Sequence, residues 1–243
     1  MIQKLIDLIL IKGAFLTFLR TKIFSLASYK MVKRMKRSGV SPKTIIDIGA
    51  NKGQFSSLSN HILNPNKIIA IEANPDLEEC LHKNLSNINS KTILITGVGN
   101  YDGELPFNFN LDSQVSSFLK IGQDRLEAYP NNKNIETRNI KIAKLDSIID
   151  TSNIEEPILL KIDVQGFEKE VIEGSINVLK RVRWVLLEIS FLNLYNGEPN
   201  FIEMLDTLKN LGFYFKGPMN FHESPDGSSI IEMDALFIKD KSI

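Results

Sequence analysis

Short apolar runs alternate with helix-like segments over most of the chain beyond residue 40. The apolar runs cover 44–49, 67–71, 91–98, 157–163, 182–188, 212–216 and 234–239. The segments with helical spacing cover 53–63, 75–87, 166–179 and 200–210. Strands that are apolar at nearly every position are typical of a parallel sheet covered on both faces. The alternation therefore predicts an α/β fold with a doubly wound, seven-stranded, mostly parallel sheet whose last strand is antiparallel.

This alternation breaks between residues 100 and 150. Residues 104–109 and 138–143 are expected to form an inserted hairpin, joined by a polar stretch rich in Asn, Gln and Ser. We expect the insertion, around 100–145, to act as a lid on a main domain at 41–243. The Gly, Pro and Ser content of 217–229 predicts a loop between the last two strands.

The N-terminal arm, residues 1–40, is basic and is predicted to form two helices. The Lys and Arg cluster at 30–37 can dock on anionic lipid headgroups while apolar residues of the arm enter the membrane interface. Those apolar residues are Leu5, Ile9, Phe15, Leu16 and Leu19. The alternative is that they pack on the main domain or on a second subunit, which would make a homo-oligomer. The apolar stretch 5–19 is too short to span a bilayer.

Charge is distributed unevenly along the chain. Residues 1–43 hold ten Lys and Arg against the acid Asp7, so a formal net charge of zero leaves the remainder mildly acidic, at −9. An acidic main domain argues against a nucleic-acid partner. Cys80 is the chain's one cysteine, which excludes an internal disulfide and is expected of a cytoplasmic protein, with the inner face of the membrane as a second location.

A glycine loop follows the first predicted strand, in the sequence Asp47-Ile-Gly49-Ala-Asn-Lys-Gly53. Glycines at a strand-to-helix turn let the backbone approach a ligand, and the helix N-terminus presents free N–H groups to it. The spacing differs from the G-x-G-x-x-G of nicotinamide-binding proteins. Asp47, two residues before the first glycine, can hold an ammonium group such as that of a methionine moiety.

Glu72 ends the second predicted strand, 23 residues after Gly49. An acid at this point of a nucleoside-binding sheet accepts hydrogen bonds from ribose hydroxyls. Asn74 precedes Pro75 and suits a helix cap.

Several motifs, taken in order, resemble the FkbM-type methyltransferases between about Thr44 and Ile238. They are DIGANKGQF (47–55), IEANP (71–75), GVGNYDGELPF (97–107), Ser116-Ser117, LKIDVQGFEKEVIEG (160–174), LLEIS (186–190) and DALF (234–237). The first two are shared by most class I methyltransferases, and the long motif at 160–174 is much more specific. The resemblance implies a Rossmann-like fold, S-adenosylmethionine as cofactor, and O-methylation of a hydroxyl on a sugar, a lipid-linked glycan or a related natural product.

The family pattern also implies which residues bind the cofactor. The set is Asp47, Gly49, Ala50, Asn51, Gly53, Gln54, Glu72, Ala73, Asn74, Val98, Gly99, Ser117 and Asp163. The first residues of this set face the methionine end of the cofactor, Glu72 and Ala73 the ribose and adenine, and Val98 and Gly99 the ring.

Three residues are candidates for catalysis: Asp163, Glu188 and His222. Asp163 ends the fourth predicted main strand, where it can position the cofactor or take the proton of the acceptor hydroxyl, and Lys161 is expected to point away from it. Glu188 ends the next strand and could join Asp163 in holding a divalent metal through oxygen ligands. His222, in the predicted loop, is a second candidate for the base. Glu168 either faces the cleft or belongs to the following helix terminus.

Two other functions remain open at this point. The chain could be a catalytically inactive, cofactor-binding scaffold in a glycan-assembly complex, although the cofactor motifs and Asp163 are intact. It could also methylate nitrogen, but the sequence after the fourth main strand, Asp163-Val-Gln-Gly166, differs from the Asn-Pro-Pro-Tyr-like loop used for planar nitrogen acceptors.

Overall fold

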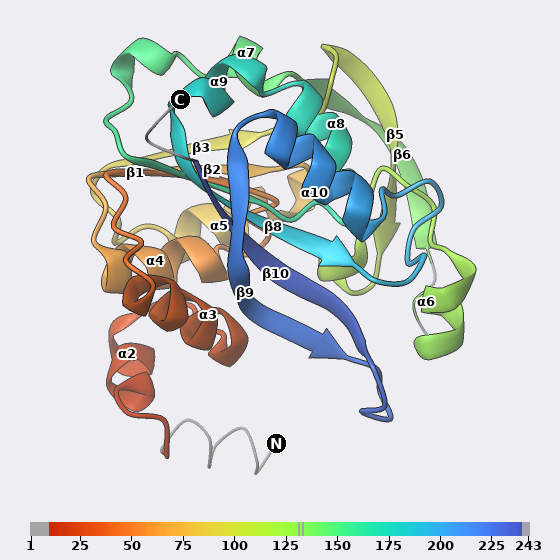
Figure 1. Cartoon of the computed structure of the whole chain (residues 1–243), viewed down its shortest axis with the longest axis horizontal. Helices are drawn as coiled ribbons and strands as arrows, with labels where there is room; N and C mark the ends of the chain where they lie inside the picture. The colour runs from red at the N-terminus through yellow and green to blue at the C-terminus, as the bar shows by residue number, and fades with distance from the viewer. Residues whose placement is uncertain (1–9, 131, 133, 240–243) are drawn as a thin grey trace.

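A computed structural model of the chain describes residues 10–130, 132 and 134–239. Its centre is a seven-stranded sheet with the strand order β3-β2-β1-β7-β8-β10-β9 (Figure 1). The strands are β1 (Thr44–Ile48), β2 (Lys67–Glu72), β3 (Lys91–Ile95), β7 (Ile158–Ile162), β8 (Val182–Ser190), β9 (Phe213–Glu223) and β10 (Ile230–Lys239). Every neighbouring pair is parallel except those of β10, which runs antiparallel to both β8 and β9. The predicted fold class is confirmed.

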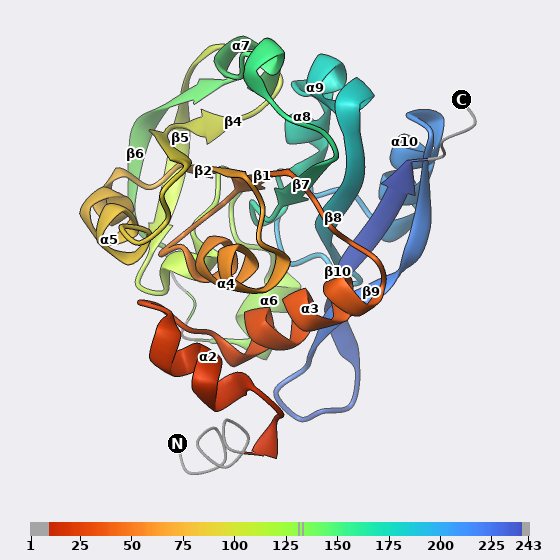
Figure 2. The same ribbon diagram turned by 90° about the vertical axis from the view of Figure 1, so that its left-hand side faces the viewer.

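Helices cover both faces of this sheet (Figure 2). One face carries α3 (Leu26–Arg37), α4 (Gln54–Leu63) and α5 (Glu78–Asn84), and the other carries α8 (Glu168–Glu173), α9 (Ile176–Arg181) and α10 (Phe201–Asn210). Successive strand residues supply the two cores alternately, because side chains of a strand alternate between its faces. Ile46 and Ile48 of β1 thus pack with α8–α10, whereas Ile45 packs with α3 and α4.

The inserted segment forms a small second sheet of β4 (Gly97–Val98), β6 (Asn134–Ala143) and β5 (Gly103–Asn110). β5 and β6 are antiparallel, with Phe107 opposite Arg138. Between them lie the short helix α6 (Gln123–Ala128) and the 3-10 turn η2 (Ser113–Val115). The small helix α7 (Leu145–Ile148) leads back towards the main sheet.

Three predicted elements differ from the structure. The strand predicted at 91–98 is divided into β3 of the main sheet and β4 of the small sheet. The helix predicted at 166–179 is divided into α8 and α9 at Gly174, where a Cβ would lie 1.8 Å from the backbone oxygen of Gly99. The loop predicted at 217–229 is wrong for most of its length, because β9 continues through Glu223 and β10 begins at Ile230. β9 is an edge strand with register shifts against β10, and an edge position tolerates a residue such as Pro218.

The N-terminal arm forms α2 (Ala14–Arg20) and α3 in its described part. Tyr29, Val32 and Met35 of α3 are buried against the α4 side of the sheet, so this half of the arm packs on the main domain. Leu5 and Ile9, predicted to enter a membrane interface, lie outside the described residues. Within those residues no helix combines the length and apolar character needed to cross a bilayer.

Candidate active site

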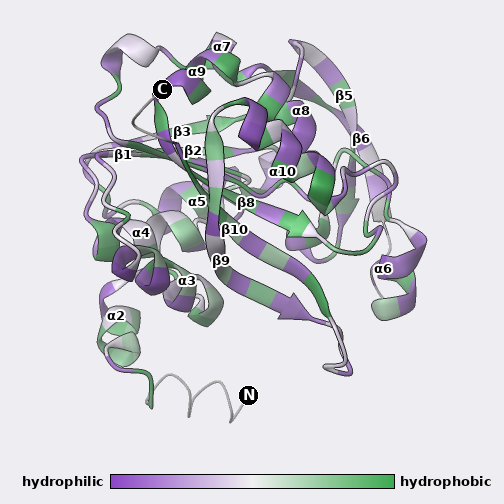
Figure 3. Ribbon diagram, in the orientation of Figure 1, coloured by the Kyte–Doolittle hydropathy of each residue, from purple (hydrophilic) through white to green (hydrophobic). Residues whose placement is uncertain are grey.

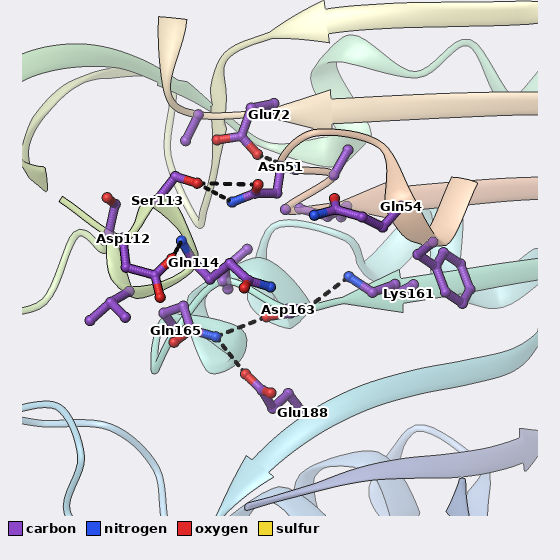
Figure 4. A pocket seen from close by; sticks show the side chains of 18 of the residues that line it. Asn51, Gln54, Glu72, Asp112, Ser113, Gln114, Lys161, Asp163, Gln165 and Glu188 are labelled. Atoms are coloured by element: carbon purple, nitrogen blue, oxygen red, sulfur yellow. Dashed lines mark hydrogen bonds and ion pairs between the residues drawn. The ribbon is translucent and has the colours of Figure 1, made fainter. Parts of the chain in front are cut away.

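A cavity of about 370 Å³ lies at the carboxyl edge of the parallel strands, between the main sheet and the inserted segment (Figure 4). Ligands of open α/β sheets bind at this edge, and the volume lies within the range of small-molecule sites. Two halves are distinguished by their elements. The ends of β1 and β2 with η2 form one half, where the sequence motifs predict the cofactor, and we call it the cofactor half. β8, β9, β10 and α6 form the other, which we call the acceptor half, and the end of β7 with Asp163 lies at the boundary between the two.

The glycine loop after β1 forms the floor of the cofactor half. Gly49 has a φ of 75°, and a Cβ on it would lie 1.8 Å from the backbone oxygen of Asp163. Gly53 has a φ of 88° at the N-cap of α4, and Asn51 between them also adopts a positive φ, of 49°. Glycine is therefore required at residue 49 by the close approach of the β7 end, not by the turn alone.

Glu72 closes the wall of the cofactor half opposite this loop. One carboxylate oxygen accepts the backbone N–H of Asn51 at 2.7 Å, and the other accepts that of Asn74 at 2.8 Å. Burial raises the pKa of Glu72, although these two hydrogen bonds oppose the shift. Each carboxylate oxygen keeps a further lone pair, so Glu72 is fixed in place and can still accept a hydrogen bond from a ligand.

Asn74 does not line the cavity. Its side chain accepts the backbone N–H of Asp76 at 2.9 Å and so caps the turn η1 (Pro75–Leu77), as its place before a proline predicts. Gly53, Gly99 and Ser117 are also absent from the walls. The hydroxyl of Ser117 donates to the backbone oxygen of Gln165 at 2.6 Å, which ties the inserted segment to the loop after β7.

Asp47 lies beneath the cavity and is fully buried. Its carboxylate accepts a 2.6 Å hydrogen bond from the Ser56 hydroxyl and lies 3.4 Å from the ammonium of Lys161. The Lys161 ammonium balances the charge of Asp47, although its Oδ1 atom accepts no hydrogen bond from the described residues. The buried position of Asp47 favours a role in holding Lys161, rather than the predicted direct contact with a ligand ammonium.

Lys161 was expected to point away from Asp163, and that expectation is wrong. The Lys161 ammonium lies 3.1 Å from the Asp163 carboxylate, because residues two apart on a strand share a face. Burial opposes ionisation of Asp163, but the charge of Lys161 and hydrogen bonds outweigh it, and the pKa of Asp163 is lowered. Asp163 is therefore a stable carboxylate in the cavity wall.

Gln165 links the two halves of the site and was not predicted as a site residue. Its side-chain amide donates to Asp163 at 2.9 Å and to Glu188 at 2.6 Å, and its amide oxygen accepts from the Tyr195 hydroxyl at 2.7 Å. The backbone of Gln165 has a φ of 60°, which is uncommon for a residue other than glycine. Strain of this kind is typical of functional loops, and the sequence offers no pattern that predicts it.

Glu168 turns back onto this same loop instead of facing the cavity. Its carboxyl group accepts the backbone N–H of Val164 at 3.0 Å and of Gly166 at 3.3 Å. Burial raises its pKa to about 8, so Glu168 holds a proton at neutral pH. It is a supporting residue of the loop after β7.

The acceptor half is a polar face made by three adjacent strands. Glu188 of β8 lies directly opposite Asp234 of β10, and Asp234 lies opposite Asn220 of β9, whose amide donates to it at 3.1 Å. Like charges directly opposite one another destabilise a sheet. Burial and neighbouring carboxylates, Asp163 first, raise the pKa of Glu188 well above its ordinary value.

His222 lies on β9, not in a loop, because that strand extends to Glu223. Its Nε2 atom is 3.9 Å from a Glu188 oxygen and 4.0 Å from an Asp234 oxygen. Cross-strand pairing also places it opposite Glu232. The sheet register thus brings His222 beside two carboxylates on the cavity wall.

Arg125 of α6 closes the acceptor half from the side of the inserted segment. Its guanidinium lies 3.6 Å from the Glu232 carboxylate and 5.2 Å from the centre of the Tyr195 ring. Arg125, Glu232 and Asn220 were not predicted. Asp234 begins the DALF motif, which was the one sequence signal that pointed to it.

Most of the predicted residues do meet in this cavity. Those in its walls are Gly49, Ala50, Asn51, Gln54, Glu72, Ala73, Val98, Asp163, Glu188 and His222. The proposed metal pair of Asp163 and Glu188 is bridged by the Gln165 amide. Among the residues that the structure describes, no three or more His, Cys, Asp or Glu side chains are grouped to hold an ion.

Two curated relatives are similar in sequence. The hexuronic acid methyltransferase AglP of Haloferax volcanii is 26% identical over 144 residues, which is 59% of this chain and 54% of the relative. The match therefore spans about half the length of that relative. The 2-O-methyltransferase NoeI of Sinorhizobium fredii is 22% identical over 170 residues, 68% of this chain and 70% of the relative.

A solved structure of Aeropyrum pernix fibrillarin with natively bound S-adenosyl-L-methionine is also similar, at 12% identity and a TM-score of 0.46, over 87% of this chain and 76% of that chain. The methyltransferase FkbM domain matches residues 47–215, which include the glycine loop, Glu72, Asp163 and Glu188. The resemblance carried by the sequence motifs is thereby confirmed. With more than half of its residues inside that match, the chain belongs to the FkbM methyltransferase family.

Proposed function

We propose that the chain transfers a methyl group from S-adenosylmethionine to a hydroxyl of a sugar or glycan. The observation that carries the proposal is that one cavity joins a cofactor half, closed by Glu72, to an acceptor half rich in carboxylates and amides and containing His222. Both reactants of a methyl transfer would then lie side by side. Holding them in line supplies a large part of catalysis.

The residues of the cofactor half suit an adenosyl cofactor. Two backbone N–H groups hold the Glu72 carboxylate in place. Its oxygens keep further lone pairs, which can accept hydrogen bonds from ribose hydroxyls. Asn51, Gln54 and Asp163 lie in the same wall and would bind the methionine end, while Val98 and Phe107 are apolar surfaces for the adenine. When bound, the cofactor supplies an electrophilic methyl group on a sulfonium.

His222 is the base that fits the geometry best. The imidazole would accept the proton of the acceptor hydroxyl as the oxygen attacks, and Asp234, whose carboxyl oxygen lies 4.0 Å from Nε2, would stabilise the imidazolium that results. Asp163 is less suited to this task because its pKa is lowered. We assign Asp163 to positioning, together with Lys161 and Gln165.

The composition of the acceptor half supports a sugar. Asp163, Glu188, Glu232 and Asp234 accept hydrogen bonds, and sugar hydroxyls donate them. These four acids face Lys161 and Arg125, each already beside an acid, so an acceptor without negative charge fits best. The name of the relative NoeI, a 2-O-methyltransferase, supports a hydroxyl as the acceptor group. The name of AglP, a hexuronic acid methyltransferase, supports a sugar, although a hexuronic acid carries the negative charge that this face of the cavity disfavours.

The test is methyl transfer by the full chain from S-adenosylmethionine labelled in its methyl group to a panel of neutral sugars, glycans and lipid-linked glycans. We expect label in a methyl ether, and loss of that label in His222→Ala. Cofactor binding without transfer to any acceptor would favour the inactive scaffold. Label recovered in a methylamine would favour nitrogen methylation and contradict the proposal.

A further inference from the structure

A second hollow, of about 200 Å³, lies between the start of the arm and α3, away from the active site. Its walls are Ile11, Lys12, Tyr29, Lys30, Lys33, Arg34 and Arg37. Five of these seven residues are cationic. The salt bridges found in the described part of the chain include none of the five.

Packing and hydrogen bonding fix both walls of the hollow. Lys30, Lys33, Arg34 and Arg37 follow the spacing i, i+3, i+4, i+7, so they form one stripe along α3. The opposite stripe is buried in the main domain. The Tyr29 hydroxyl donates to the backbone oxygen of Lys12 at 2.9 Å and so fixes the other wall of the hollow.

Beside this cationic hollow lies α2, whose residues are mostly hydrophobic (Figure 3). Ala14 and Thr17 face inward and are buried, whereas Phe15, Leu16 and Leu19 are 46%, 58% and 62% exposed. Leu10 and Phe18 are exposed as well. Several large apolar residues exposed within ten positions make a patch, and such patches mark interaction sites.

The active-site cavity reaches the other side of the same helix. Ser28 and Met31 of α3 line that cavity, while their neighbours Tyr29 and Lys30 line the cationic hollow. α2 and α3 lie together at one end of the molecule (Figure 2). A surface that docks on α2 and the hollow is therefore close to the cavity.

We propose that α2 and the cationic hollow form a docking surface for an anionic phospholipid membrane, with the apolar residues of α2 in the interface and a lipid phosphate in the hollow. Charge complementarity selects this partner, because apolar side chains flanked by a cationic stripe match the acyl and headgroup layers of such a membrane. The docking does not depend on the proposed reaction, but it would place a lipid-linked acceptor near the cavity.

Co-sedimentation of the full chain with vesicles, without cofactor or acceptor, tests the proposal. We expect binding to vesicles of phosphatidylcholine with 30% phosphatidylglycerol and weak binding to phosphatidylcholine alone.

Each surface cation contributes a factor of about five to binding at an anionic membrane. Replacing Lys30, Lys33, Arg34 and Arg37 by Gln should weaken binding by at least about 100-fold. The Phe15→Ser, Leu16→Ser, Leu19→Ser variant should also lose binding, and because these side chains are exposed we expect the fold to stay intact.

The matched control replaces four exposed lysines elsewhere, Lys83, Lys169, Lys209 and Lys216, by Gln, and it should bind as the wild type does. Equal binding by control and arm variants would overturn the proposal. So would calorimetric binding of inorganic phosphate without vesicle binding, which would make the hollow a site for a free anion. A concentration-dependent dimer that ignores vesicles would assign the α2 face to a second copy instead.

Discussion

The two halves of the active-site cavity are built in different ways. In the cofactor half, the essential groups come from two short segments, the glycine loop at 47–53 and the end of β2, and Glu72 is held by backbone N–H groups. In the acceptor half, side chains from β8, β9 and β10 meet through sheet register, with Glu188 directly opposite Asp234.

This difference indicates that the cofactor half contributes more to the stability of the fold, whereas the groups of the acceptor half are arranged for function. In the cofactor half, backbone N–H groups hold Glu72, and the backbone at Gly49 closely approaches that of Asp163. The acceptor half crowds carboxylates whose pKa values are raised, Glu188 most clearly by burial and by Asp163. Crowded charge of this kind is a common property of functional sites. We therefore expect mutations in the cofactor half to alter folding and cofactor affinity, and mutations in the acceptor half to alter turnover.

The largest expected effect is that of Gly49→Ala. A Cβ would lie 1.8 Å from the Asp163 backbone oxygen at a φ of 75°, so the β1 and β7 ends must separate. We expect a loss of more than about 4 kcal/mol in the free energy of unfolding, measured by denaturant unfolding. The control is Gly39→Ala, where φ is 86° but nothing lies within 4 Å, and its cost should stay near about 1–2 kcal/mol. Equal costs would show that the contact is not essential.

The next largest effect is expected for His222→Ala, which should change turnover and leave cofactor affinity nearly unchanged. Loss of the base is expected to lower kcat by about 10²–10⁴-fold, while the Kd of S-adenosylhomocysteine changes by less than about twofold, because His222 lies in the acceptor half. Steady-state kinetics and calorimetry measure the two effects. A larger fall in kcat for Asp163→Asn, with His222→Ala nearly active, would transfer the role of base to Asp163.

Glu72→Gln should have a smaller effect, confined to the cofactor half. Its amide can accept from one side only, so an N–H of Asn51 or Asn74 would face an amide donor and a ribose contact would weaken. Hydrogen bonds to a charged group contribute about 1.5–3 kcal/mol, so we expect the Kd of S-adenosylhomocysteine to rise about 10- to 100-fold. The KM for the acceptor should stay unchanged. An unchanged cofactor affinity would contradict the assignment of Glu72.

Glu168→Gln should have the smallest effect on turnover and on cofactor affinity, because Glu168 supports the loop after β7 and does not line the cavity. The pKa of Glu168 is raised to about 8 in the folded chain from 4.5, so the folded state keeps a proton that the unfolded state loses. Stability should therefore fall as pH rises from about 4.5 to about 8, by no more than about 5 kcal/mol. Gln can still accept the Val164 and Gly166 N–H groups, so the variant should remove this slope in denaturant titrations at several pH values. A slope equal to that of the wild type would rule Glu168 out as its source.

The sequence predicted the cofactor half better than the acceptor half for a physical reason. Gly49 and Glu72 act through local geometry at strand ends, which apolar runs and turn residues reveal. Arg125 reaches the cavity from the inserted helix α6, Gln165 through a backbone with positive φ, and Glu232 through cross-strand register. None of these features produces a periodic pattern in the sequence. The sequence did not predict the full length of the β9–β10 hairpin, because an edge strand accepts the Gly, Pro and polar residues that elsewhere indicate a loop.

The most direct test of the account is calorimetric titration of the full chain with S-adenosylhomocysteine, alongside Glu72→Gln and His222→Ala, with NAD as the control ligand. The account predicts micromolar binding by the wild type and by His222→Ala, a 10- to 100-fold weaker Kd for Glu72→Gln, and no binding of NAD. Absence of adenosyl binding in the wild type, or binding of NAD in its place, would contradict the assignment of the cofactor half.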